Sequence, residues 1–238
     1  MRRLILALGF LTRLPVPRIA GATGDFAAAI RLYPLVGLVI GAIVAGAGLA
    51  GAWFDPWIGA LAALLAWVWI TGALHLDGLG DLADGLGAAH GDRDRLIAVM
   101  ADPRVGSFGV VAIVLQLLVK LVLLHVILTG DAWTLLAVPA VARIGPLVWA
   151  HRVPPLKPSG LGAAVAGSVR LRDMIGWGLL LLAAAMVYPG LLAGPVMILG
   201  LARWFRWRLG GMTGDAHGAG IELVESGMLF VIALIVSG

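Results

Sequence analysis

Residues 57–85 decide the fold of this chain, and they read WIGALAALLAWVWITGALHLDGLGDLADG. The segment Trp57–Leu76 is apolar and long enough to cross a membrane, since a helical span needs about 20 mostly apolar residues. Three carboxylates, Asp77, Asp81 and Asp84, follow this segment directly. Acidic groups beside hydrocarbon are costly, and they usually hold a cation or move a proton. The stretch therefore predicts a membrane protein with a functional site at the end of a span.

The composition of the whole chain supports a membrane protein. Hydrophobic residues make up 61% of the 238 residues and charged residues only 13%, against roughly 25% charged in soluble proteins. Cysteine is absent, which excludes disulfides and thiolate metal sites. The net charge is +4, but the basic residues follow the predicted membrane topology instead of forming one patch, so nucleic acid is not an expected partner.

The apolar segments predict an all-α, polytopic membrane bundle of about seven transmembrane helices in a single domain, residues 1–238. An N-terminal segment, residues 1–31, precedes the first span, and its part Leu4–Leu11 is expected to lie as a short helix in the membrane interface. The fifth and sixth spans are expected to be joined by a turn near Tyr188-Pro189-Gly190. The predicted spans are Pro34–Phe54, Trp57–Leu76, Val105–Thr129, Ala132–Ala150, two within Met174–Leu209, and Gly220–Ser237.

The basic residues predict the orientation of these spans. Lysine and arginine gather in alternate connections, as the positive-inside rule requires of cytoplasmic segments. The N-terminus and the two acidic loops, residues 77–104 and 203–219, are therefore expected in the cytoplasm. The cationic residues that carry this argument are Arg2, Arg3, Arg13, Arg18, Arg31, Arg93, Arg95, Arg104, Arg152, Lys157, Arg170, Arg172, Arg203, Arg206 and Arg208.

The first acidic motif has a spacing that suits a metal site. Asp77, Asp81 and Asp84 lie four and three positions apart, which places them on one face of a helix. Like charges so close repel one another unless a cation lies between them. Mg²⁺ takes carboxylate oxygens and leaves positions open for phosphates, so it is the expected ion. A solvated acidic loop is the plain alternative.

A second acidic group lies near the C-terminus. Asp215, Glu222 and Glu225 would share one side of a helix, and Gly214, Gly218 and Gly220 predict a broken or re-entrant start to that helix. We expect this group to complete the metal site. The alternative is that Glu222 and Glu225 form ion pairs with two cations inside the spans, Lys120 and Arg143.

Two arginines are candidate phosphate ligands. Asp102 and Pro103 are expected to begin the third span, as its N-cap and first residue. Arg104, followed by the sequence GSFG at residues 106–109, would then place a cation at a helix N-terminus, which suits a phosphate. Arg143 lies inside the fourth predicted span, and either substrate contact or structural ion pairing would explain it.

Four motifs in this order resemble the cobalamin synthase family, the adenosylcobinamide-GDP ribazoletransferases. They read FLTRLPVP at residues 10–17, LDGLGDLADG at 76–85, DPRVGSFG at 102–109 and GDAHGAGIELVE at 214–225. The resemblance implies a Mg²⁺-dependent phosphotransferase of late cobalamin biosynthesis, a multi-pass protein of the bacterial inner membrane. It would join adenosylcobinamide-GDP to α-ribazole, or to α-ribazole 5′-phosphate, and release GMP. The preferred base and the oligomeric state stay open, although the many small residues would allow a homo-oligomer.

The resemblance also suggests roles for individual residues. It implies that the metal ligands are Asp77, Asp81, Asp84, Asp215 and Glu222. In the mechanism that we expect, the ribazole 5′-hydroxyl attacks and either Asp81 or Glu222 accepts its proton. Arg104 and Arg143 are expected to contact the substrate phosphates.

Other functional classes fit the sequence less well. A CDP-alcohol phosphotransferase would need Ala-Arg where Asp81-Leu82 stand, and aspartate-rich prenyltransferases carry two comparable motifs. A cation-coupled transporter predicts internal repeats and a site near the middle of the bilayer. We find no repeat, and the main acidic motif lies at the end of a span.

Overall fold

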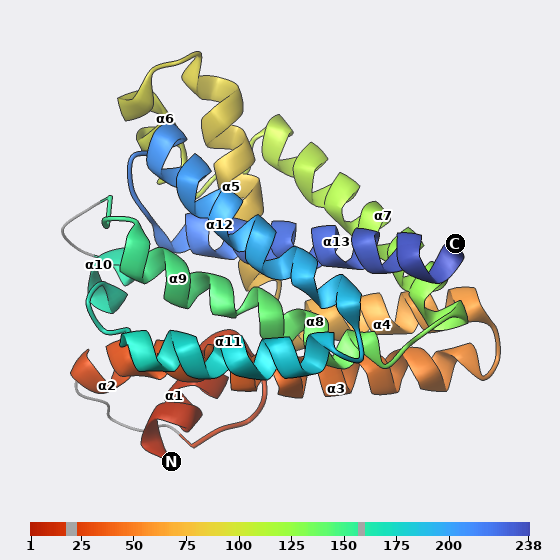
Figure 1. Ribbon diagram of the computed structural model, residues 1–238. Helices are drawn as coiled ribbons and strands as arrows, with labels where there is room; N and C mark the ends of the chain where they lie inside the picture. The colour runs from red at the N-terminus through yellow and green to blue at the C-terminus, as the bar shows by residue number, and fades with distance from the viewer. Residues whose placement is uncertain (18–22, 157–159) are drawn as a thin grey trace.

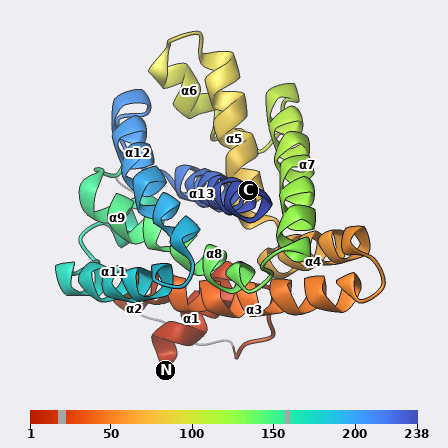
Figure 2. The same ribbon diagram turned by 45° about the vertical axis from the view of Figure 1, so that its right-hand side comes forward.

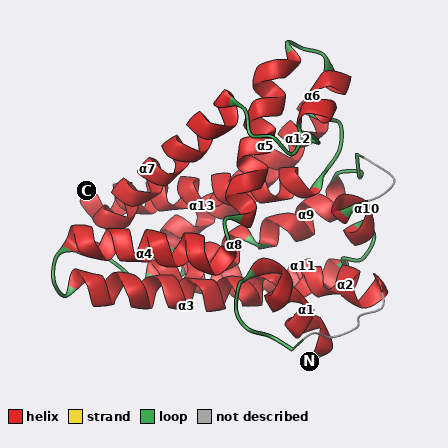
Figure 3. Ribbon diagram, turned by 180° about the vertical axis from the view of Figure 1, so that it is seen from behind, coloured by secondary structure: helices red, strands yellow, loops and turns green. Residues whose placement is uncertain are grey.

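The computed structural model describes residues 1–17, 23–156 and 160–238, and these residues form helices with no strand among them (Figure 1; Figure 3). A single parallel bridge between Pro155 and Met212 joins two loops. The predicted all-α class is therefore confirmed. Arg18 and Lys157, which contributed to the predicted topology, lie outside the described residues.

A helical hairpin forms one side of the molecule (Figure 1). It consists of α3 (Tyr33–Ala52) and α4 (Pro56–Thr71), which pack along each other. The Asp55 carboxylate accepts hydrogen bonds from the Trp57 and Ile58 amides at 2.8 and 3.3 Å, which caps α4. The predicted span Pro34–Phe54 is confirmed as a helix except at its end, because α3 ends at Ala52.

Short N-terminal helices precede this hairpin. They are α1 (Arg2–Leu11), α2 (Thr23–Ala29) and the 3₁₀ helix η1 (Ile30–Leu32). The run Gly24–Ala52 is helical without interruption, so the first span begins before the predicted boundary at residue 31. The inner face of α1 is buried on α2 and α3, and its position at a membrane surface stays a prediction.

A sharp bend separates α4 from the helix that carries the first acidic motif. Helix α5 (Leu74–Ala89) follows α4 at an angle of 85°. Gly72 and Ala73 form the bend with φ of 60° and 58°, a left-handed conformation that costs free energy for alanine. The predicted span to Leu76 is therefore wrong at its end. The carboxylates lie on a separate helix, as their spacing predicts, and the alternative of a solvated acidic loop is wrong.

The next helices correct a second boundary. Helix α6 (Arg93–Val99) is followed by α7 (Ser107–Thr129), which starts four residues after Pro103. Asp102 accepts hydrogen bonds from Arg104 instead of capping α7. Residues 77–104, predicted as a loop, are mostly helical.

The fourth predicted span is interrupted. It forms α8 (Thr134–Ala142) and α9 (Ile144–Arg152), which meet at Arg143. Pro146 has no amide hydrogen to bond the Ala142 carbonyl, and it is accommodated because it lies in the first turn of α9. Arg143 lies at this break, and its side chain is fully buried in the protein interior.

Four shorter elements complete the periphery, namely α10 (Leu161–Val165), α11 (Leu171–Ala185), η2 (Pro189–Leu192) and α12 (Ala193–Arg208). The predicted turn near Tyr188 is confirmed, because η2 joins α11 to α12 there. Arg31 fixes the start of α11 through an ion pair with Asp173 at 3.3 Å.

The C-terminal helix lies at the centre of the molecule. Viewed nearly along its axis, α13 (Gly214–Ser237) is surrounded by other helices (Figure 2), and it packs against α5, α7, α8, α9 and α12. The Thr213 hydroxyl caps it by accepting a hydrogen bond from the Ala216 amide at 3.0 Å. The helix is continuous from Gly214, so the predicted broken start is wrong.

Four helical runs are long and apolar enough to cross a membrane. The bent pair Pro56–Thr71 and Leu74–Ala89 would make a fifth if it forms one broken span. Helices α11 and α12 have only 15 and 16 residues. The four runs are Gly24–Ala52, Ser107–Thr129, Thr134–Arg152 and Gly214–Ser237.

Candidate active site

Two glycines bring the first acidic motif against the second. A Cβ added at Gly78 on α5 would lie 2.6 Å from the backbone oxygen of Asp215 on α13. A Cβ at Gly218 would lie 3.3 Å from the Cα of His75. Only residues without a side chain allow helices to approach so closely. The crossing of α5 and α13 therefore places acidic residues from distant parts of the sequence side by side.

Asp81 lies among other carboxylates at this crossing. It is partly buried, whereas Asp77, one turn earlier, is exposed. Asp77, Asp84 and Asp215 all act on Asp81 electrostatically. The structure thus brings together Asp77, Asp81 and Asp215, as the sequence predicts, and we refer to these three residues as the acidic cluster.

Asp84 has a different set of partners. Its two carboxylate oxygens accept hydrogen bonds from the Gly106 and Gly109 amides at 2.7 and 2.8 Å. These amides lie in the first turn of α7, where hydrogen-bond donors are unpaired and the helix dipole favours a negative charge. A buried carboxylate of α5 therefore caps α7 from outside that helix. The role of Asp84 as a metal ligand stays a prediction.

The second acidic motif divides between two sites. Glu222 lies seven residues beyond Asp215 on the continuous helix α13, which is about 10 Å along its axis. It accepts a hydrogen bond from the Gln116 amide at 2.8 Å and pairs with Lys120 at 2.7 Å. The structure does not bring Glu222 to the acidic cluster. Its expected roles as metal ligand and proton acceptor therefore have no support, and the alternative of internal ion pairing describes it.

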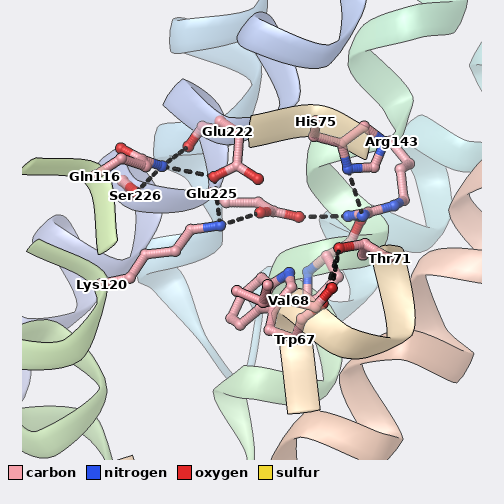
Figure 4. A network of polar contacts seen from close by, with 11 residues as sticks. Trp67, Val68, Thr71, His75, Gln116, Lys120, Arg143, Glu222, Glu225 and Ser226 are labelled. Carbon is pink, nitrogen blue, oxygen red and sulfur yellow. Dashed lines mark hydrogen bonds and ion pairs between the residues drawn. The ribbon is translucent and has the colours of Figure 1, made fainter. Parts of the chain in front are cut away.

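Glu225 completes this buried arrangement (Figure 4). One of its oxygens pairs with Lys120 at 2.6 Å and the other with Arg143. The Lys120 ammonium also lies 4.4 Å from the centre of the Trp67 ring, where a cation is attracted to the aromatic face. We refer to Lys120, Arg143, Glu222 and Glu225 as the ion network, and all four side chains are almost completely buried.

Neither arginine predicted to bind phosphate lies beside the acidic cluster with an open guanidinium. Arg143 pairs with Glu225 and donates to the Pro139 carbonyl at 2.9 Å, and it is inaccessible to solvent. The structure thus favours the ion-pairing alternative for Arg143. Arg104 is exposed and pairs with Asp102 at 2.8 Å, so its contact with substrate stays a prediction.

A cavity of about 240 Å³ borders the acidic cluster. Asp77 and Asp215 line one part of it, and most of the remaining wall is apolar. A more open cavity of about 440 Å³ shares Asp77 with it and is lined by Arg13. Arg13 contributes to the predicted topology and to the first family motif. Tyr33 and His75 line the smaller cavity, and no role is predicted for them from the sequence. For His75 the only signal in the sequence is its position two residues before Asp77 in the first acidic motif.

The donor atoms of the acidic cluster suit a hard cation. In the described part of the chain no three His, Cys, Asp or Glu residues are arranged to hold a metal by themselves. Mg²⁺ commonly binds through one or two carboxylates and takes its other ligands from substrate phosphates and water. The carboxylates of the acidic cluster supply oxygen ligands of the kind that Mg²⁺ prefers, and the binding of this ion stays a prediction.

Comparisons with known proteins give one result along the whole chain. The family model described as cobalamin-5-phosphate synthase matches residues 3–233. A protein of Novosphingobium aromaticivorans named adenosylcobinamide-GDP ribazoletransferase is 54% identical, with 98% of this chain and 97% of the relative covered. Relatives of the same name from Laribacter hongkongensis and Thiobacillus denitrificans are 50% and 48% identical, each over 97% of this chain and over 96% and 94% of their own lengths. No solved structure shows significant similarity.

Proposed function

The chain belongs to the cobalamin-5-phosphate synthase family, and we propose that it joins adenosylcobinamide-GDP to a ribazole nucleoside with release of GMP. The observation that carries this proposal is the approach of Asp77 and Asp81 to Asp215 across the α5–α13 crossing. This approach gathers three carboxylates beside a cavity, where the reaction of the family could take place. Transfer of a phosphoryl group needs positioning and charge neutralisation more than covalent help from the protein.

We assign the proton transfer to Asp81. In the proposed step a ribose hydroxyl attacks the phosphorus attached to cobinamide, a new P–O bond forms, and the bond to GMP breaks with its electron pair on GMP. Asp81 accepts the hydroxyl proton, and its partial burial at the centre of the acidic cluster supports this role. Glu222 is excluded as the acceptor in this proposal because the ion network holds it.

We propose a different attacking hydroxyl from the 5′-hydroxyl that we expected from the sequence. The family description names a product that carries a 5-phosphate. A 5′-oxygen that already bears phosphate has no proton to lose and cannot attack. We therefore place the nucleophile at another hydroxyl of the ribose, and α-ribazole and its 5′-phosphate can then react in the same way.

Asp77 and Asp215 would hold Mg²⁺ in this proposal, which leaves Asp81 free to accept the proton and places Asp84 and Glu222 outside the ligand set. When bound, the ion would neutralise the diphosphate oxygens and the charge on departing GMP. The exposed position of Asp77 leaves room for the substrate to approach.

We also propose the complete membrane topology. In it, α11 and α12 are two short spans, which brings the total to seven when α4 is counted as a span of its own. The acidic cluster then faces the cytoplasm of a bacterial inner membrane, where nucleotide substrates occur. The arginines near the ends of α9 and α12 support this orientation.

The reaction can be tested with the full chain purified in detergent. With adenosylcobinamide-GDP, α-ribazole and Mg²⁺, we expect stoichiometric formation of GMP and of a joined cobamide, detected by chromatography and mass spectrometry. Removal of Mg²⁺ with a chelator should stop both products, and added Mg²⁺ should restore them. Release of GMP without α-ribazole would indicate a hydrolase, and full activity without divalent ions would contradict the Mg²⁺ assignment.

A further inference from the structure

The cavity beside the acidic cluster has a wall that is apolar apart from a few polar groups. Side chains from α1, η1, α9, α10 and α13 supply its apolar surface, and they include Phe10, Leu11, Ile30, Pro146, Val165 and Ile221. Its volume of about 240 Å³ is below the roughly 300–1,000 Å³ of sites for drug-sized ligands. A corrinoid is larger than such ligands and cannot enter. A flat base of two fused rings can.

Three residues of this wall carry a buried polar atom without a hydrogen-bond partner. These atoms are Tyr33 Oη, His75 Nε2 and His217 Nε2. Native proteins seldom leave buried polar atoms unpaired, because such an atom loses its hydrogen bonds to water and gains none in exchange. Unpaired atoms on residues that line a cavity beside an acidic cluster therefore point to a ligand that supplies the missing partners.

The hydrogen bonds on the opposite ring nitrogens define what each histidine offers. His217 Nδ1 lies 2.8 Å from the Thr213 carbonyl, which can only accept, so this nitrogen carries the hydrogen and Nε2 is an acceptor in a neutral ring. His75 Nδ1 lies 3.4 Å from an Arg143 nitrogen, which can only donate. His75 Nε2 therefore carries the hydrogen. The wall offers one donor, one acceptor and a tyrosine hydroxyl.

From these features we propose that the cavity binds the acceptor nucleoside, with its apolar base among the aliphatic side chains and its ribose toward Asp77 and Asp215. This inference rests on the proposed function and names the part of the site that selects one substrate. A benzimidazole base has one ring nitrogen that accepts, which matches a donor such as His75 Nε2 or Tyr33 Oη. A ribose hydroxyl donates to the His217 acceptor. Guanine has several donors and acceptors along its edge, and the apolar wall would leave most of them unpaired.

Enlarging a wall residue tests the assignment. Val165→Phe should fill the cavity, and we expect the KM for α-ribazole to rise at least about tenfold, the discrimination that one methylene gives in an apolar pocket. The KM for adenosylcobinamide-GDP should change less than about twofold. Val196→Phe is the matched control, because Val196 is 72% exposed on α12, and it should leave both values unchanged.

A smaller base provides a result that a folding defect cannot produce. The riboside of unsubstituted benzimidazole lacks the two ring methyl groups of α-ribazole, so Val165→Phe should raise its KM less. If Val165→Phe does not fold, Ile221→Phe replaces it, because Ile221 lines the same cavity from α13.

Direct titration separates this proposal from the reaction itself. Isothermal titration of the wild-type protein with α-ribazole alone should show binding that Val165→Phe weakens, even if no product forms under the assay conditions. A rise in KM for adenosylcobinamide-GDP alone would assign the cavity to the nucleotide donor and overturn the proposal. Unchanged constants for both substrates in a folded variant would overturn it as well.

Discussion

The acidic cluster and the ion network contain the same kind of residue in opposite surroundings. The charged groups that act on Asp81 are other carboxylates, and one of them, Asp77, is exposed. In the ion network two carboxylates meet two cations, Lys120 and Arg143, and all four are buried. The ion network has two cations for its two carboxylates, whereas the acidic cluster consists of carboxylates beside a cavity. The difference supports the proposal that the acidic cluster serves a ligand and that the ion network holds helices together.

Substitution of Asp81 should have the largest effect, and it tests whether the acidic cluster carries catalysis. Asp81→Asn keeps the size of the side chain but removes the proton acceptor, and we expect the rate of GMP release to fall about a thousandfold. The melting temperature in detergent should change little, because the substitution removes mutual repulsion among carboxylates. Asp131→Asn, in a distant turn, serves as the control and should retain full activity. Near-normal turnover by Asp81→Asn would exclude Asp81 from the mechanism.

Removal of Lys120 should have the next largest effect and tests the structural side. Lys120→Met leaves Glu222 without its cation in the interior, and breaking a buried pair in this way costs about 3–5 kcal/mol. Thermal unfolding in detergent, followed by circular dichroism, should show the loss.

The double variant Lys120→Met with Glu222→Gln makes this test specific. It leaves Arg143 and Glu225 as a neutral pair, so it should be more stable than the sum of the two single changes predicts, by about 0.5–3 kcal/mol. Simple additivity would mean that the four charges do not act as one network.

Substitution of Asp84 should have the smallest effect, and it tests whether this residue caps α7 or belongs to the metal site. Asp84→Asn directs an amide nitrogen at one of the two α7 amides that the carboxylate now binds, and we expect a loss of about 1–3 kcal/mol in stability. The Mg²⁺ concentration for half-maximal activity should stay the same at a temperature where the variant is folded. A large increase in that concentration would return Asp84 to the metal site.

Much of the fold follows from the sequence because lipid imposes simple requirements. Long apolar segments indicated the helices α3, α7 and α13, and Tyr188-Pro189-Gly190 indicated a turn. The end of α4 did not follow from hydropathy, because Gly72 and Ala73 bend the chain within an apolar run. The start of α7 did not follow either, because its cap is Asp84, which lies on another helix and which no local pattern identifies.

The candidate site was predictable in part for the same reason. The spacing of Asp77 and Asp81 is a property of one helix, and it identified half of the acidic cluster. Glu222 has the same chemistry and lies in the other acidic motif. Its assignment depended on whether Lys120, more than a hundred residues away, would lie beside it.

The sequence by itself thus determined that this protein is a helical membrane enzyme of the cobalamin-5-phosphate synthase family with acidic motifs near Asp77 and Asp215. Only the tertiary structure decided how these acids divide. Gly78 lets α13 approach α5, which brings Asp215 to Asp81, and the continuous turns of α13 carry Glu222 and Glu225 away toward Lys120 and Arg143. The physical reason is that charge pairing depends on distances between helices, and local sequence patterns encode only distances within one helix.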